Sequence, residues 1–180
     1  MEEYAYILDY LPQGVSGGQY GKREPLCYAL GDEEFKLFEL IPKAPVVVGQ
    51  RVYIGKDTSK RAEIDHVKRR INLSELSRNA NAELEYTIEQ IAVEKAARFL
   101  RFYDLAGPLS LKKHALEELP GLGKMGVQSI LDARKDGPFT SYANLTERTK
   151  VKTPEKLIAA RILMEITDEN LKRYLFVSKK

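Results

Sequence analysis

The chain has 180 residues, of which 43% are hydrophobic and 31% are charged, a composition typical of a globular protein rather than a disordered one. Its apolar runs are far too short for a membrane span, and its opening residues lack the pattern of a signal peptide, so we expect a cytoplasmic protein that makes no membrane contact. The single cysteine, Cys27, cannot form an internal disulfide and suits a reducing compartment. With only two histidines besides, a zinc site has too few ligands, and we expect no metal or organic cofactor.

The net charge of +3 conceals an uneven distribution along the chain. Residues 1–49 carry 4 basic and 8 acidic side chains, a balance of −4, whereas residues 50–70 carry 7 basic and 3 acidic side chains, a balance of +4. A phosphate-binding face is one interpretation of this contrast, and a solvated, lysine-rich hairpin is the other.

The first 76 residues show the patterns of β-strands. Strand-like segments are separated by glycine and proline turns, and the glycine-rich stretch from Gln13 to Gly21 predicts a loop. The segments are Glu3–Leu11, Leu26–Leu30, Phe35–Ile41, Val46–Gly55 and Arg61–Leu73. Five strands without a long helix among them predict a small closed or nearly closed β-barrel over residues 1–76.

From Asn79 the apolar residues recur at intervals of three and four, which predicts an all-helical domain over residues 77–180. A first helix of about six turns, capped by Asn79 or Asn81, should end at Gly107. Shorter helices are expected at 111–119, 124–135 and 141–148, from Pro154 onward with Thr153 as the cap, and at 168–176. The predicted fold class is therefore α+β, a barrel followed by helices.

One motif in the helical part carries most of the functional information. Its residues are Leu119, Gly121, Leu122, Gly123, Val127 and Ile130. These positions, within about 110–135, closely resemble the hairpin of the helix-hairpin-helix family, which grips nucleic-acid backbones. A helix–helix corner that contains glycine and binds no ligand is the alternative.

The resemblance implies a role for each residue of the turn. Leu122 would point inward, and the missing β-carbons of Gly121 and Gly123 would let the chain turn and a phosphate approach. Amides at the start of the next helix would bind that phosphate, with Lys124 as a neighbouring charge. Such contacts read no bases, so we expect binding to DNA or RNA that is largely independent of sequence. A monovalent cation held by the hairpin carbonyls is compatible with this interpretation.

Residues 138–166 resemble the second half of a paired helix-hairpin-helix unit. The corresponding turn, Lys150 to Thr153, has no glycine. Its lysines could contact a backbone through their side chains, or this half could serve only for packing.

The strand from Val48 to Gly55 leads into a basic hairpin and looks like part of an OB-fold. Its combination with the hairpin motif resembles a small uncharacterised archaeal family that is predicted to bind nucleic acid. In such a fold, cations would follow the phosphates while Tyr4, Tyr6 or Tyr53 stacked on bases, unless these tyrosines belong to the barrel core or rim. The cations are Arg51, Lys56, Lys60 and Arg61.

Two other classes of function are weighed against a non-catalytic binder. A repair enzyme would need a catalytic acid or lysine, but Phe139 stands in the Gly137-Pro138 motif, and the pair Asp132 and Asp136 reads as ordinary surface charge. Neither His66 nor His114 has an evident nucleophilic partner. A protein-interaction module would use the apolar run Tyr174–Val177 as an anchor for a protein partner.

Overall fold

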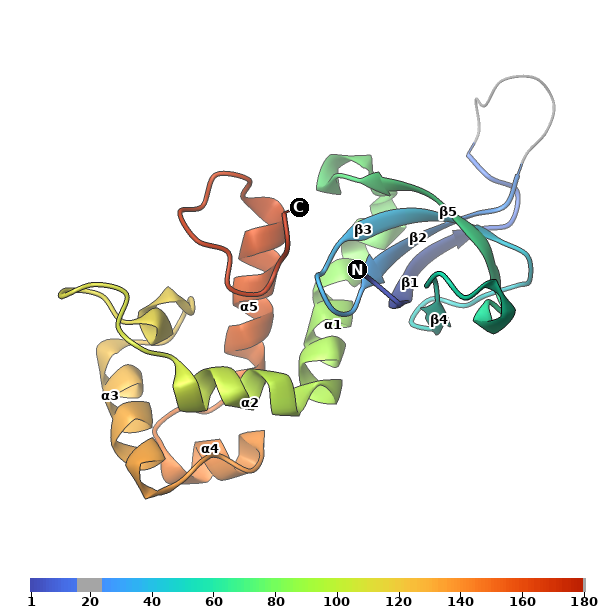
Figure 1. Ribbon diagram of the computed structural model, residues 1–180. Helices are drawn as coiled ribbons and strands as arrows, with labels where there is room; N and C mark the ends of the chain where they lie inside the picture. Colours follow the sequence, from blue (N-terminus) through green and yellow to red (C-terminus); the bar gives the residue numbers. More distant parts are fainter. Residues whose placement is uncertain (16–23, 180) are drawn as a thin grey trace. The chain divides into compact units, whose positions relative to one another are not determined.

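The computed structural model describes residues 1–15 and 24–179, which form two compact units (Figure 1). The sheet unit comprises Met1–Thr87 and Glu165–Lys180, and the helical unit comprises Ile88–Met164. This division differs from the split expected at residue 76, because the boundary falls inside helix α1 (Arg78–Glu94) and the end of the chain groups with the sheet. Most of the predicted loop at 13–21 lies outside the described residues.

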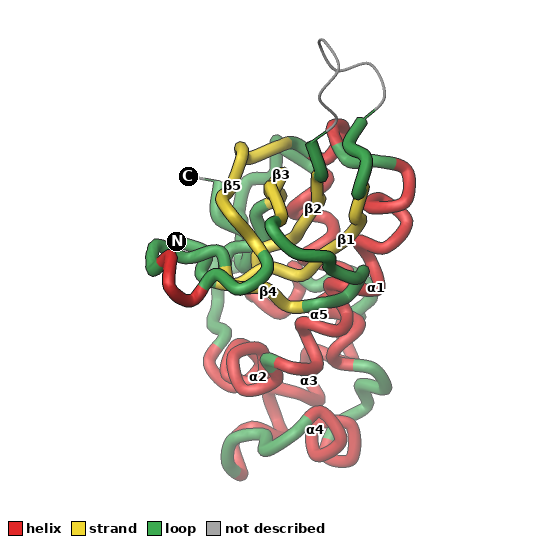
Figure 2. The backbone as a smooth tube through the Cα atoms, turned by 90° about the vertical axis from the view of Figure 1, so that its right-hand side faces the viewer, coloured by secondary structure: helices red, strands yellow, loops and turns green. Residues whose placement is uncertain are grey.

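The five expected strands are present and form one antiparallel sheet in the order β4-β1-β2-β3-β5. No ladder joins the edge strands β4 and β5 within the two described ranges, so the sheet is a curled half-barrel, where a closed or nearly closed barrel was expected. Figure 2 shows the strands following this curve from β5 to β4. The strands are β1 (Tyr4–Leu11), β2 (Leu26–Gly31), β3 (Leu37–Pro42), β4 (Arg51–Tyr53) and β5 (Ile64–Ile71).

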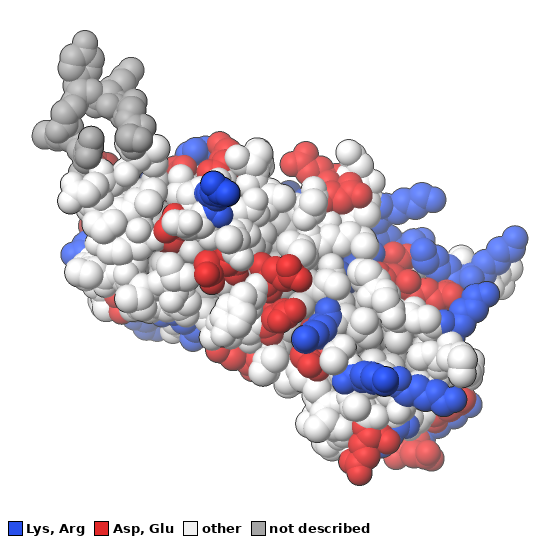
Figure 3. All heavy atoms as spheres, turned by 180° about the vertical axis from the view of Figure 1, so that it is seen from behind, with Lys and Arg blue, Asp and Glu red and all other residues white. Residues whose placement is uncertain are grey.

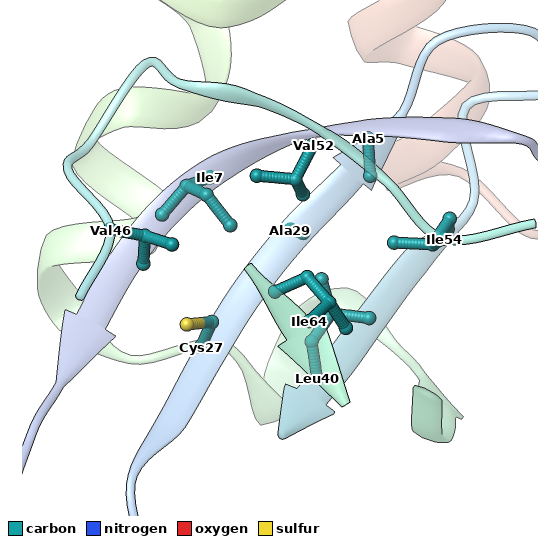
Figure 4. Close-up of a cluster of buried hydrophobic side chains, with 9 residues drawn as sticks. All are labelled: Ala5, Ile7, Cys27, Ala29, Leu40, Val46, Val52, Ile54 and Ile64. Atoms are coloured by element: carbon teal, nitrogen blue, oxygen red, sulfur yellow. The ribbon is translucent and has the colours of Figure 1, made fainter. Parts of the chain in front are cut away.

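The concave face of the sheet holds a buried apolar cluster (Figure 4). Alternation along each strand sends every second side chain inward, as Ala5 and Ile7 do in β1. A bulge between Ile7 and Asp9 then shifts the register of β1 against β2. The cluster consists of Ala5, Ile7, Cys27, Ala29, Leu40, Val46, Val52, Ile54 and Ile64. Removing this surface from water stabilises the curl of the sheet.

The start of α1 is tied to the sheet by a serine. Ser77 Oγ donates to Asp9 Oδ2 at 2.6 Å and accepts from the N–H of Ala80 at 3.1 Å. Ser77 is therefore the capping residue, and the expected caps Asn79 and Asn81 are wrong. The sequence pattern missed it because no apolar repeat begins until Leu84.

The C-terminal segment is held by one buried carboxylate. Glu165 Oε1 accepts the N–H groups of Phe176 at 2.9 Å and Val177 at 3.0 Å. The helix expected at 168–176 is wrong, since residues 168–179 form only turns, bends and extended chain. Both Phe176 and Val177 are buried, so the apolar anchor considered for a protein partner is used inside the sheet unit.

The helical unit differs from the apolar period at its first helix. The expected six-turn helix is in fact two, α1 and α2 (Ala96–Leu105), because Lys95 leaves the helical conformation at φ −100° and ψ 37°. The unit also contains α3 (Lys124–Ala133), α4 (Tyr142–Arg148) and most of α5 (Pro154–Thr167), which starts at the proline as predicted. Among the described residues, no helix combines the length and apolar character required to cross a membrane.

Candidate nucleic-acid interface

The hairpin turn begins with a tight β-turn at Leu119–Leu122. The N–H of Leu122 donates to the carbonyl of Leu119 at 3.2 Å, and Gly121 adopts a φ of +90°. Proline at the second position and a left-handed glycine at the third are the requirements of a type II turn. Pro120 and Gly121 therefore shape the backbone, as the motif predicted for the first glycine.

Leu122 packs back onto helix α3. A β-carbon built on Gly126 would lie 2.5 Å from Leu122 Cδ1, so the leucine occupies the space that glycine leaves open. Val151 Cγ2 lies on the same side, 3.7 Å from that position. The structure thus places Leu122 inward and adds Gly126 to the motif as its packing partner. The sequence contained this signal as a glycine inside an otherwise good helix.

Gly123 differs from Gly121 in both conformation and surroundings. Its φ of −78° and ψ of 173° suit any residue, and a β-carbon here would meet nothing within 4 Å. The expectation that both glycines shape the turn is therefore corrected, because only Gly121 does. Gly123 keeps the start of α3 open to solvent.

Among the residues that the structure describes, no side chain caps the start of α3. Gly123 offers no side chain, and the first intrahelical bond runs from the N–H of Val127 to the carbonyl of Gly123 at 3.0 Å. The amides of Lys124, Met125 and Gly126 therefore open the helix without an intrahelical acceptor. The helix dipole adds partial positive charge at the same point.

Three lysines surround a depression of about 330 Å³ next to the hairpin. They are Lys112, Lys113 and Lys124, and all three side chains are exposed. Lys113 also pairs with Glu118, Nζ to Oε1, at 3.2 Å. Sequence reasoning selected Lys124 alone, although the adjacent pair Lys112-Lys113 just before the motif was a readable signal. Figure 3 shows lysine and arginine side chains gathered over helices of the helical unit.

The helix expected at 111–119 before the hairpin is wrong. Only a 3-10 turn, Ala115–Glu118, is present, preceded by a bridge between Pro108 and His114. His114 caps this turn, because its Nδ1 accepts the N–H of Leu116 at 3.1 Å. Burial, reinforced by the charge of Arg134, lowers the pKa of His114, which keeps Nδ1 unprotonated for this role.

The second half of the unit is organised differently. Its turn lies between α4 and α5, and two of its amides already have acceptors: Lys150 N–H bonds Ser129 Oγ at 3.3 Å and Val151 N–H bonds Thr149 Oγ1 at 3.1 Å. Val151 is buried, whereas Lys150 and Lys152 are exposed. This turn can therefore offer lysine side chains to a phosphate but fewer backbone donors than the hairpin.

The four basic residues selected in the sheet unit divide into two kinds. Arg51 bonds Asp32 Oδ2 at 2.9 Å and lies 3.7 Å from the Tyr4 ring centroid, and Arg61 bonds the carbonyl oxygens of Gly55 and Asp65. Both arginines thus support local structure. The side chains of Lys56 and Lys60 are exposed, although Lys60 Nζ also lies 5.9 Å from the Tyr53 ring centroid.

The tyrosines considered for base stacking are mostly inaccessible. Tyr6 is 3% exposed, and Tyr53, at 9%, packs edge-on against Tyr4 with centroids 5.3 Å apart. Tyr4 is in turn covered by Arg51. The interpretation of these residues as core or rim side chains fits the structure better.

The structure gives the local setting of three residues that an enzyme could use. Cys27 is fully buried, and burial raises the pKa of its thiol to about 12. Asp132 accepts from Gln128 Nε2 at 2.9 Å, and His66 Nδ1 lies 2.6 Å from Asp65 Oδ2 on the surface. Within the described part of the chain, no three His, Cys, Asp or Glu side chains gather as metal ligands would.

Comparison with known proteins finds relatives that align with nearly the whole chain. The family described as "Protein of unknown function (DUF655)" matches residues 1–178. The uncharacterized protein MJ0038 of Methanocaldococcus jannaschii is 39% identical over 182 residues, 99% of this chain and 81% of that protein. The crystal structure of Af1531 from Archaeoglobus fulgidus matches with a TM-score of 0.90 at 35% identity and covers 98% of this chain and 100% of its own. Both relatives are archaeal, and neither name states an activity.

Proposed function

The chain belongs to the DUF655 family, and we propose from its own geometry that it is a non-catalytic protein that grips the phosphate backbone of DNA or RNA. The grip is the turn from Gly121 to Lys124, used as a helix-hairpin-helix. The contact reads no base edges, so affinity is largely independent of sequence. Lys56 and Lys60, on the basic hairpin that follows β4 in the OB-like sheet unit, supply a second contact.

The observation that carries the proposal is the contrast between the two glycines of the turn. Gly121 is explained by its φ of +90°, but nothing within the helical unit requires glycine at position 123. A serine or aspartate there would cap α3 at least as well. Glycine at an open, uncapped helix start suits close approach of an anion to the amides.

The surrounding charge supports the same ligand. Lys112, Lys113 and Lys124 line one depression beside these amides. A phosphodiester carries one negative charge per nucleotide and can contact both amides and ammonium groups. Lysine acts at such sites as a point charge that requires no exact geometry.

The test measures binding of a 20-base-pair duplex to the full chain at several salt concentrations. Lys124→Gln should weaken binding about fivefold, close to 1 kcal/mol, and reduce the salt slope by roughly 0.9, because one phosphate contact is lost. Gly123→Val should weaken it further, since the side chain occupies the approach to the amides while φ and ψ remain allowed.

The matched control is Lys135→Gln, which removes the same charge just beyond the far end of α3, where Lys135 Nζ lies 3.9 Å from Asp132 Oδ1. It should leave affinity and salt slope nearly unchanged. If Lys124→Gln and Gly123→Val bind like the control while circular dichroism shows them folded, the hairpin is not the grip.

A further inference from the structure

The sheet unit carries a basic groove of its own. Two depressions, of about 430 and 410 Å³, share the lining residues Lys36 and Arg70 and adjoin there; together they are called the groove. Leu37 lines the first and Phe38 the second, so they lie on opposite faces of β3 and meet near the end of β5. The first runs along the end of β5 and the C-terminal segment, and the second runs between the edge strands β4 and β5. Each volume lies within the range of ligand sites.

The groove is lined by more basic than acidic groups. Its cations are Lys36, Lys56, Arg61, Arg70 and Lys179. Two carboxylates also line it. Glu2 is 5% exposed and accepts the N–H groups of Glu33 and Glu34, so it faces the backbone, and Glu169 lies at the other end. Lys36 pairs with Glu34 at 2.5 Å.

The floor between the edge strands is apolar. Phe38 and Val67 are half-buried, pack against the core cluster and line the groove, together with Ile54. Phe38 of β3 is the register partner of Arg70 in β5, so the ring and the guanidinium lie on one face of the sheet. An aromatic ring beside cations along a groove is the arrangement that stacks bases while following phosphates.

We infer that this groove binds an unpaired strand of nucleic acid, with a base against Phe38 and phosphates along Lys56, Arg70 and Lys179. The inference rests on the proposed function. It narrows the ligand to a nucleic acid that has a single-stranded segment for the groove and a segment whose backbone the hairpin can reach. A paired base cannot present its face to Phe38, because the face is already stacked within the duplex. A polyanion without bases would bind the cations of the groove but would make no stacking contact with the Phe38 ring.

The first experiment removes three cations that line the groove. The triple variant Lys56→Gln, Arg70→Gln and Lys179→Gln is compared with the control Lys43→Gln, Lys68→Gln and Lys172→Gln, whose exposed cations lie outside it. Binding of a 12-nucleotide oligothymidylate should weaken about 100-fold in the groove variant, three contacts at about fivefold each, and its salt slope should fall by about 2. Equal losses of affinity in both variants would show that the groove contributes only general positive charge, and would overturn the inference.

The second experiment tests the base contact with Phe38→Leu, which keeps an apolar side chain in place. The variant should bind the oligothymidylate at least fivefold more weakly. An abasic strand of equal length should bind the wild-type chain more weakly by the same factor, and Phe38→Leu should weaken abasic binding no further. If Phe38→Leu weakens both strands equally, the ring supports structure only and the inference fails.

The hairpin variants separate this inference from the proposed function. In wild-type background, Lys124→Gln should affect the 20-base-pair duplex. The groove triple should weaken duplex binding only about fivefold, through the loss of Lys56, against about 100-fold for the single strand. If the groove variant binds the single strand more weakly while Lys124→Gln leaves duplex binding unchanged, the groove is supported as a binding site and the hairpin is refuted. If Lys124→Gln weakens duplex binding while the groove triple binds the single strand like the wild-type chain, the hairpin is supported and the groove is refuted.

Discussion

The two glycines of the hairpin should respond oppositely to alanine. At Gly121 the φ of +90° costs an L-residue about 1–2 kcal/mol, and the new methyl lies 3.3 Å from Leu157 Cδ2. Alanine also reduces the conformational freedom of the unfolded chain, which stabilises the folded state by about 0.4–1 kcal/mol. Together these effects should lower the free energy of unfolding of Gly121→Ala by about 1 kcal/mol.

At Gly123 alanine brings the same stabilisation of about 0.4–1 kcal/mol through the unfolded state, and the φ and ψ of this position cause no backbone strain. It is offset only by the poorer capping of alanine, which costs a similar amount, so Gly123→Ala should be nearly neutral. The helical unit contains α2, α3 and α4, and its unfolding is followed by circular dichroism in urea. A loss of 1 kcal/mol lowers the midpoint by about 0.5–1 M at a typical denaturant slope.

The contrast itself is the test. Equal midpoint losses in both variants, or a larger loss in Gly123→Ala, would refute the assignment of Gly121 to the backbone and Gly123 to the ligand. Loss of duplex binding in Gly123→Ala at unchanged stability would agree with it.

Two further predictions concern the support of the hairpin. Burial lowers the pKa of His114, so the unfolded state takes up the proton first and unfolding free energy should fall as the pH drops below 6.5. His114→Asn retains a side-chain acceptor for the Leu116 amide and should flatten that dependence in urea melts from pH 8 downward; an unchanged slope would contradict the role of His114 as a cap. Arg161 is 3% exposed and bonds Glu118 Oε2 at 3.2 Å. Glu118→Leu should cost about 3 kcal/mol, because the buried guanidinium loses the carboxylate that neutralises it, although it keeps the Glu118 carbonyl at 3.1 Å. Adding Arg161→Met should recover most of this loss; a double variant no more stable than the single would argue against this pair.

Features decided by local chemistry were predictable from the sequence. Proline at the first position of α5, the Pro-Gly of the type II turn and the alternation of the strands each specify their own backbone. The alternation of β1 to β5 correctly predicted the five-stranded sheet.

Features decided by distant contacts were not predictable. The apolar spacing runs unbroken from Ile91 through Phe99, so the turn of the chain at Lys95 leaves no trace in the pattern. The two N–H groups bound by Glu165 lie 11 and 12 residues further along, and a carboxylate in a helix gives no sign in the sequence of such distant donors. Phe38 and Arg70 come from β3 and β5, which only the pairing of these two strands brings together.

The open curl of the sheet has a consequence for self-association. An unclosed sheet exposes two rows of backbone donors and acceptors, to which a second copy could add a strand and begin a fibre. Here one edge, β4, is only three residues long, and the other, β5, places Lys68, Arg69 and Arg70 in succession. Short length and like charge both oppose strand addition. The half-barrel can therefore stay open without becoming a template for aggregation.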